Sequence, residues 1–206
     1  MKKYFFLLIL IITTSCKAQK SLLMMPKIDN KFEKFDQDHY NKIYKKDIYL
    51  AYDKLSDGTY IEMDQSKNMK SYVETPLNSY YRITKIYYTN GNIKSKGLSS
   101  NTGYFQKDIW YEFDEQGNLI KETDYDKPFK FTFEDILKFC EKENIEIKKG
   151  PISQSGWHNI ISRKIETDKP IWKIERLKRS DLVEIITLDG ITGKVIKRET
   201  EEYLNN

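Results

Sequence analysis

Tyr87-Tyr88-Thr89-Asn90-Gly91-Asn92-Ile93-Lys94 contains the clearest β-hairpin signal in this 206-residue chain. Its Asn-Gly pair favours a turn with positive φ at the central residues, which joins two antiparallel strands. A similar stretch, Glu112-Phe113-Asp114-Glu115-Gln116-Gly117-Asn118-Leu119, follows, with its Gly-Asn pair 26 positions later. The echo predicts two hairpins of the same kind.

Two further features extend this pattern along the chain. Asp57-Gly58 marks another turn between alternating segments, and the fifteen tyrosines of the chain favour half-buried strands. Together these signals predict an antiparallel β-meander. The hairpins expected in it pair residues 48–52 with 60–63, 80–89 with 93–96, and 110–113 with 119–125.

A helix is predicted immediately after the meander. Thr132 and Asp135 fit a capping box, and apolar residues recur at helical spacing over about 133–143. Gly190 and Gly193 mark a tight turn farther along. Three strands are expected between the helix and this turn, at 159–166, 171–178 and 181–188. The predicted fold class is α+β, an antiparallel β-meander with a C-terminal helix and a three-stranded antiparallel sheet.

Residues 86–125 resemble the variant MORN repeat, a family of short β-hairpin units that stack side by side. The resemblance implies that the hairpins of this segment stack in the same way. Lys107-Asp108-Ile109 departs from the family, which usually has a glycine shortly before the tryptophan. The positions that match its pattern are Tyr88, Gly91, Lys96, Gly97, Trp110, Tyr111, Asp114, Gly117, Leu119 and Lys121.

The C-terminal part resembles the PepSY family of small extracytoplasmic domains over about 132–198. Trp172-Lys173-Ile174-Glu175 and Asp189-Gly190-Ile191-Thr192-Gly193-Lys194-Val195-Ile196 carry the resemblance. In that family the second motif shapes a turn at the end of a strand and is not catalytic. The resemblance implies protease inhibition or another task in the cell envelope.

The first residues form an export signal. Lys2 and Lys3 precede an apolar run at 4–12, which is too short to cross a membrane as a helix. Thr13-Thr14-Ser15-Cys16 resembles the lipobox of bacterial lipoproteins, which implies that Cys16 is the first mature residue and the site of lipid attachment. Simple secretion after cleavage behind Ala18 is the alternative.

The lipoprotein resemblance also implies a location. Lys17 stands where an aspartate would imply retention at the inner membrane. We therefore expect a lipid-anchored protein of the cell envelope, at the outer membrane and facing the periplasm. The alternative is a secreted or periplasmic soluble protein.

Changes in pattern along the chain predict its domain boundaries. Residues near helical spacing predict a short helix over 32–46 that covers one edge of the sheet. The predicted organisation is a signal peptide at 1–15, a tether at 16–31, a meander domain at 32–128 and a helix-and-sheet domain at 129–206.

Composition and spacing argue against several kinds of chemistry. The formal charge of +4 falls to +2 without Lys2 and Lys3, and interleaved charges argue against nucleic-acid binding. The chain has two histidines, His39 and His158, without the spacing of zinc ligands. Cys140 lies on the apolar stripe of its helix, where a thiol acts as a small hydrophobe; a nucleophile paired with His158 is the alternative. We predict no enzyme, no cofactor and no metal site.

Aromatic side chains form the remaining candidate surface. They cannot all be buried on one face, because side chains alternate between the two faces of a sheet. The alternative is that the helix or the neighbouring sheet covers the second face. These aromatic residues are Tyr80, Tyr81, Tyr87, Tyr88, Tyr104, Trp110 and Tyr111.

The sequence thus predicts a non-catalytic envelope lipoprotein with two kinds of partner, the membrane through Cys16 and another protein. The sharpest form of this hypothesis is an immunity protein or an inhibitor of a secreted toxin or protease. The alternative is an envelope structural or ligand-sensing lipoprotein that binds a glycan or a small molecule.

Overall fold

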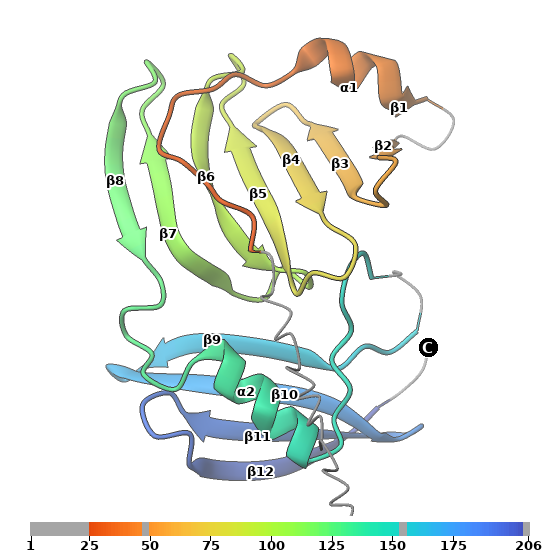
Figure 1. The fold of residues 1–206 in the computed structure, drawn as a ribbon, viewed down its shortest axis with the longest axis vertical. Helices are drawn as coiled ribbons and strands as arrows, with labels where there is room; N and C mark the ends of the chain where they lie inside the picture. Colours follow the sequence, from red (N-terminus) through yellow and green to blue (C-terminus); the bar gives the residue numbers. More distant parts are fainter. Residues whose placement is uncertain (1–24, 47–49, 153–155, 204–206) are drawn as a thin grey trace, which may run out of the picture.

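The computed structural model describes residues 25–46, 50–152 and 156–203, and two antiparallel sheets dominate it (Figure 1). One sheet has eight strands, each paired with the next along the chain, and the other has four in the order β12-β11-β10-β9. The architecture is α+β, as predicted. The elements are α1 (Gln37–Ile43), β1 (Tyr44–Lys45), β2 (Leu50–Lys54), β3 (Tyr60–Gln65), β4 (Lys70–Thr75), β5 (Tyr81–Tyr87), β6 (Ile93–Ser100), β7 (Gln106–Phe113), β8 (Leu119–Asp124), α2 (Phe133–Lys142), β9 (Ile160–Glu166), β10 (Lys169–Arg179), β11 (Leu182–Asp189) and β12 (Val195–Glu202).

The two hairpins with echoing sequences form, and their turns are built alike. The amide of Gly91 donates to the Tyr88 carbonyl, and the amide of Gly117 donates to the Asp114 carbonyl, each over 3.0 Å. Each glycine has positive φ, +87° and +93°, whereas Asn90 does not. A register shift lies beside each turn, so these are bulged loops with one left-handed glycine, not turns with positive φ at both central residues.

The structure contains two longer strands that the sequence patterns did not predict. β4 pairs with both of its neighbours, but its side chains are half-buried from Lys70 to Glu74, without a clear alternation. β12 adds a fourth strand to the C-terminal sheet, so the prediction of three strands is wrong. Val195 and Ile196 are exposed and most of the strand is charged, so it carries no buried alternation to recognise.

The N-terminal helix is shorter than predicted. α1 begins after its N-cap Asp36 instead of at residue 32. Residues 29–36, which we call the N-terminal strap, run without helical structure across one face of the meander sheet (Figure 1). The amide of Phe35 donates to the Gly91 carbonyl over 2.8 Å. Pairing with a turn distant in sequence holds these residues outside the helix.

Lys96 fastens the strap to β6. Its side chain is 5% exposed, and Nζ donates to the Lys31 carbonyl over 2.6 Å and to Asp29 Oδ1 over 3.0 Å. Glu33 Oε1 lies 3.2 Å from the same nitrogen. Asp29 and Lys31 belong to the segment predicted as a tether, so the end of that segment lies against the sheet.

A hydrophobic core joins the two predicted domains. Tyr81 and Phe105 come from the meander and pack with Phe133 of α2 and Trp172 of β10. The Phe105 ring centroid lies 5.1 Å from that of Phe133 and 5.4 Å from that of Trp172. A second core lies under the strap and includes Phe35. The meander and the C-terminal sheet are therefore packed together and not only linked in sequence.

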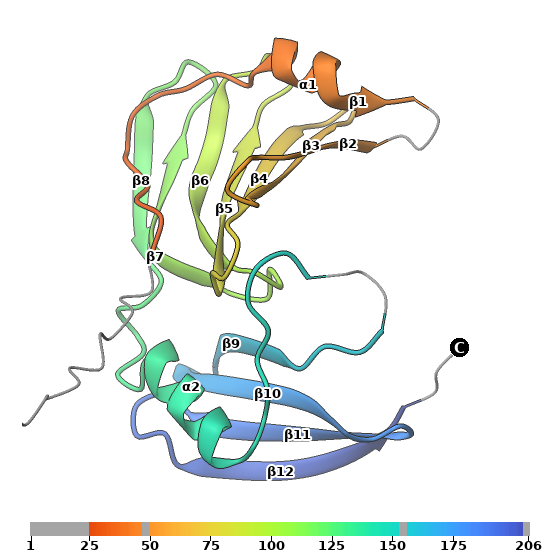
Figure 2. The ribbon, with the colours of Figure 1, turned by 45° about the vertical axis from the view of Figure 1, so that its right-hand side comes forward.

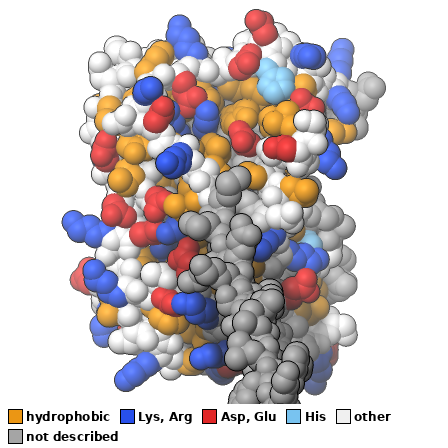
Figure 3. All heavy atoms as spheres, in the orientation of Figure 1, with side chains coloured by type: hydrophobic (Ala, Val, Ile, Leu, Met, Phe, Trp, Pro, Cys, Tyr) orange, Lys and Arg blue, Asp and Glu red, His pale blue; other side chains and the backbone are white. Residues whose placement is uncertain are grey.

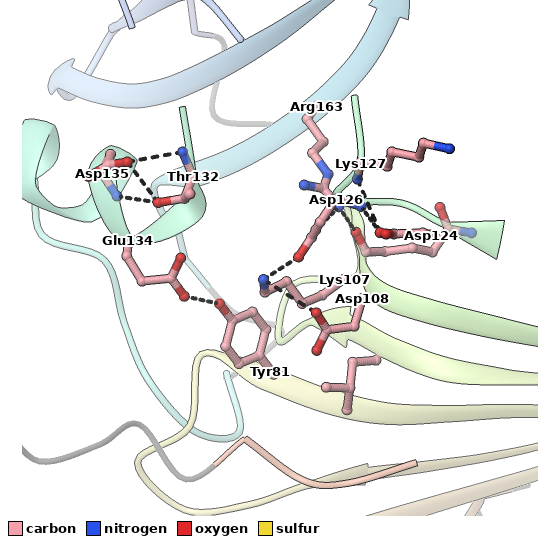
Figure 4. A network of polar contacts seen from close by, with 12 residues as sticks. Tyr81, Lys107, Asp108, Asp124, Asp126, Lys127, Thr132, Glu134, Asp135 and Arg163 are labelled. Atoms are coloured by element: carbon pink, nitrogen blue, oxygen red, sulfur yellow. Dashed lines mark hydrogen bonds and ion pairs between the residues drawn. The ribbon is translucent and has the colours of Figure 1, made fainter. Parts of the chain in front are cut away.

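Polar contacts reinforce the same junction (Figure 4). Asp126 accepts hydrogen bonds from Lys107 and from Arg163 Nη2, the latter over 2.7 Å. The predicted capping box is confirmed, since Thr132 and Asp135 bond each other at the start of α2. Tyr81 Oη of the meander also donates to Glu134 Oε1 of α2 over 3.2 Å. The contacts of Asp126 and Glu134 thus hold the segment after β8, β9 and the start of α2 against the lower end of the meander.

The outer surface carries charges of both signs. Figure 3 shows acidic and basic side chains interspersed over the face that the strap crosses. Among the helices in the described residues, none has the length and apolar character needed to cross a membrane.

Candidate functional site: the Arg82 groove

A groove crosses the face of the meander sheet opposite the strap. One hollow of about 600 Å³ opens there, and a second of about 440 Å³ continues it toward β9. The two hollows share Glu62, Arg82, Asn101 and Ile152, so we treat them as one depression, the Arg82 groove. Aromatic side chains complete its lining: Tyr52, Tyr60, Tyr104 and Trp157.

Strand register explains which side chains line the groove. Tyr52 lies opposite Glu62, and Glu62 lies opposite Val73, across three neighbouring strands. Directly opposed residues project from the same face of an antiparallel sheet. Ile61 and Met63 alternate with them along β3 and are buried in the core under the strap. β3 thus gives one face to the core and the other to the groove.

Arg82 is the most unusual residue of the groove. It is half-buried, and its Nε atom is buried without a hydrogen-bond partner among the described residues. Burial lowers the pKa of its guanidinium and Glu62 opposes this effect, but arginine remains charged at physiological pH. A buried charged donor without an acceptor is unfavourable. Arg82 therefore brings to the groove a guanidinium that forms no hydrogen bond or ion pair within the described residues.

The loop after β6 closes against the guanidinium. A Cβ atom on Gly103 would lie 2.3 Å from Arg82 Nη2, and the φ of Gly103 is +81°. A side chain at this position would collide with the guanidinium and strain the loop. Gly103 therefore allows close packing that restricts the orientation of Arg82.

Asn101 holds the segment before β9 against the groove. Its side-chain nitrogen donates to the carbonyl oxygens of Lys148 over 2.9 Å and Gly150 over 3.3 Å. The amide of Gly150 in turn donates to the Ser79 carbonyl over 2.7 Å. Figure 2 shows this segment, between α2 and β9, rising to the lower end of the meander sheet. These bonds place Ile152 beside the groove.

Aromatic rings line both hollows at different depths. Tyr52 and Tyr60 are half-buried, with ring centroids 5.9 Å apart, and burial raises the pKa of Tyr60. Tyr104 is 56% exposed at the second hollow. Trp157 lies there too and packs edge-on against Tyr203, at a centroid distance of 4.9 Å. The groove therefore offers several aromatic faces beside the cation of Arg82 and the carboxylates of Glu62 and Asp64.

The aromatic surface predicted from sequence overlaps with this site at one residue only. Tyr104 lines the groove, whereas Tyr81, Tyr87 and Trp110 are buried. Tyr80, Tyr88 and Tyr111 are half-buried, and none of the three lines either hollow. No sequence pattern marked Tyr52, Tyr60 or Arg82 as site residues. One pattern could have indicated Arg82. It lies in the same strand as Tyr81 and Tyr87, which are buried in the core, and its even-numbered position projects from the opposite face of the sheet.

The other candidate residues lie apart from one another. His39 is on α1, with its Nε2 3.5 Å from Asp53 Oδ2, while His158 lines the second hollow. Cys140 lies in the core of the junction, and Cys16, the predicted lipid attachment site, is outside the described residues. Within the described part of the chain, no three potential ligands converge as a metal site requires.

Cys140 is expected to be unreactive in the folded protein. The residue is 2% exposed, and burial raises the pKa of its thiol to about 12, so the reactive thiolate is strongly disfavoured. In the chain with Cys16→Ser, which retains only this thiol, a thiol reagent such as dithionitrobenzoate should react at pH 8 only after unfolding in guanidinium. Rapid reaction of the folded protein would contradict this burial.

Comparison of the chain with protein-family models, curated proteins and solved structures found no match.

Proposed function

We propose that this chain is a non-catalytic protein of the bacterial cell envelope, anchored by a lipid on Cys16, that binds a protein partner in the Arg82 groove. The most specific form of this proposal is that the chain is an immunity protein or an inhibitor of a secreted toxin or protease. The observation that carries the proposal is Arg82, whose buried Nε has no acceptor among the described residues. A partner that places an acceptor against this guanidinium in the groove would gain a charge-assisted hydrogen bond.

The composition of the groove supports a protein partner. Tyrosine, tryptophan and arginine are enriched at the residues that dominate binding energy in protein interfaces. The groove combines Arg82 with Tyr52, Tyr60 and Trp157. Such side chains suit contact with the surface of another macromolecule.

A small ligand or glycan is the second candidate. The first hollow, of about 600 Å³, falls within the range of small-molecule sites. Tyr52 and Tyr60 could pack against the face of a sugar or another flat group. This candidate shares the site with the first and differs in the partner.

The test uses the mature chain with Cys16→Ser as bait on native envelope extracts, followed by calorimetry with the purified partner. Arg82→Gln removes the positive charge of Arg82 from the groove, while Arg179→Gln makes the same change at an arginine that is 66% exposed. We expect one stoichiometric partner, with affinity about tenfold lower or more for Arg82→Gln and unchanged for Arg179→Gln.

Two outcomes would contradict the proposal. A partner bound equally well by Arg82→Gln must use another surface. A native bait that carries a glycan or small molecule, and captures no stoichiometric protein, would favour the second candidate. Circular dichroism of both variants shows whether either substitution has disturbed the fold.

A further inference from the structure

We infer that the occupant of the Arg82 groove is an extended peptide segment of the partner that carries two opposite charges, a carboxylate bound by Arg82 and a cation bound by Glu62. This inference rests on the proposed function and specifies the partner element that the groove recognises.

Glu62 and Arg82 are the charged side chains that line both hollows of the groove, and Asp64 lines the first hollow only. Glu62 and Arg82 line both hollows, and within the described residues neither forms an ion pair or a side-chain hydrogen bond. They influence each other electrostatically, yet they are not within the 4 Å of a direct salt bridge. Opposite charges held apart in one groove are complementary to a ligand that presents both signs, because each would pair with a different group.

The surroundings of Arg82 and Glu62 indicate which charged group each would bind. Arg82 is half-buried in the groove, and within the described residues its side chain forms no hydrogen bond or ion pair, so an acceptor that enters the groove would meet an unpaired guanidinium. Arginine binds a carboxylate through a planar fork of donors, and a charge-assisted bond at a buried site is strong. Glu62 is half-buried beside Tyr52 and Tyr60, and aromatic faces also attract cations. We therefore expect Arg82 to bind the carboxylate and Glu62 to bind the cation.

The Arg82 groove extends across several strands. The hollows follow one another from β2, past β3 and β5, to the segment before β9, and Glu62 and Arg82 lie where they overlap. An extended peptide can follow such a path while it places neighbouring side chains at both charges. Acidic and basic residues close together in a flexible segment provide this chemistry.

A phage-displayed library of random dodecapeptides provides the first probe. Selection on the folded Cys16→Ser chain should enrich peptides that contain acidic and basic residues close together. Selection on Arg82→Gln should lose the acidic preference, and selection on Glu62→Gln should lose the basic preference. Arg179→Gln should select the same peptides as the parent. A library that yields no binders, or the same residues from all four proteins, would overturn the inference.

Calorimetry with one selected peptide provides the quantitative test. Replacing its acidic residue with the matching amide should weaken binding to the parent chain about 10- to 150-fold, the range of a charge-assisted hydrogen bond. The same replacement should change binding to Arg82→Gln by less than about twofold, because the paired group is already absent. Equal losses with both proteins would show that the peptide carboxylate does not contact Arg82.

The two proposals fail in different ways. If the native partner depends on Arg82 but the selected peptides carry no preferred charges, the proposed function stands and the peptide inference is wrong. If the native partner is indifferent to Arg82→Gln, the proposed function itself fails, whatever the library yields.

Discussion

Replacing Arg163 with alanine is expected to lower the free energy of unfolding by about 3 to 5 kcal/mol, the range for breaking a buried ion pair. The Arg163 side chain is 5% exposed and pairs with Asp126 at the junction. Its guanidinium also lies 4.5 Å from the Phe129 ring centroid and 5.2 Å from that of Trp172. Alanine removes the charge, the hydrogen bonds and the contacts with these rings together.

Denaturation in urea measures this loss, and a neighbouring residue provides the control. Lys164 is also cationic but its side chain is 51% exposed, so Lys164→Ala should change stability by less than about 0.5 kcal/mol. Arg163→Lys keeps the charge but lacks the planar guanidinium, so the stability of this variant should lie between that of Arg163→Ala and that of the parent. A loss below about 1 kcal/mol for Arg163→Ala would contradict the structural role of the residue.

The effect of Arg163→Ala should also depend on pH. Burial raises the pKa of Asp126, but hydrogen bonds from Lys107 and Arg163 outweigh it and lower the pKa overall. A carboxylate with a lowered pKa stabilises the fold above its unfolded pKa of about 3.9, and this stability is lost as pH falls through the folded pKa. The stability difference between parent and variant should therefore shrink below about pH 4.

Replacing Lys96 with alanine is expected to have the second large effect. The free energy of unfolding should fall by about 3 kcal/mol, because the partners of Lys96 on the strap lose their common donor. Lys96 Nζ holds the Lys31 carbonyl and the Asp29 carboxylate, and lies near Glu33. Without it, the strap should separate from the sheet more readily. Faster hydrogen exchange at the Phe35 amide, which bonds Gly91, would report this directly.

An exposed lysine on the same strand provides the control for Lys96. Lys94 is exposed and has no ion pair among the described residues, so Lys94→Ala should leave both the stability and the exchange of the strap nearly unchanged. Equal protection of the Phe35 amide in Lys96→Ala and in the parent would show that the strap is held by other contacts.

Local chemistry made the hairpins and α2 predictable from the sequence. A glycine in each echoing turn and the Thr132 capping box act on residues only a few positions away. The strap was not predictable in the same way, because Phe35 pairs with Gly91 across a long stretch of chain. Its apolar spacing resembled a helix, and the distant pairing determined the outcome.

The groove was hidden from sequence patterns for a related reason. Glu62 comes from β3, Arg82 from β5 and Asn101 from the loop after β6, and only the strand register brings them together. Nothing in the spacing of these residues marks a site. The sequence did indicate that tyrosines must occupy both faces of the sheet, but it did not show which of them remain accessible.

The most direct test of the account is the Nε–H signal of Arg82 in a proton–nitrogen correlation spectrum, assigned by its loss in Arg82→Gln. Adding the purified partner to saturation should shift this proton, as an acceptor of the partner pairs with the Arg82 guanidinium, while the Nε–H signal of Arg163 at the junction stays in place. An Arg82 signal that does not move when the partner is fully bound would contradict the claim that the Arg82 groove is the binding site.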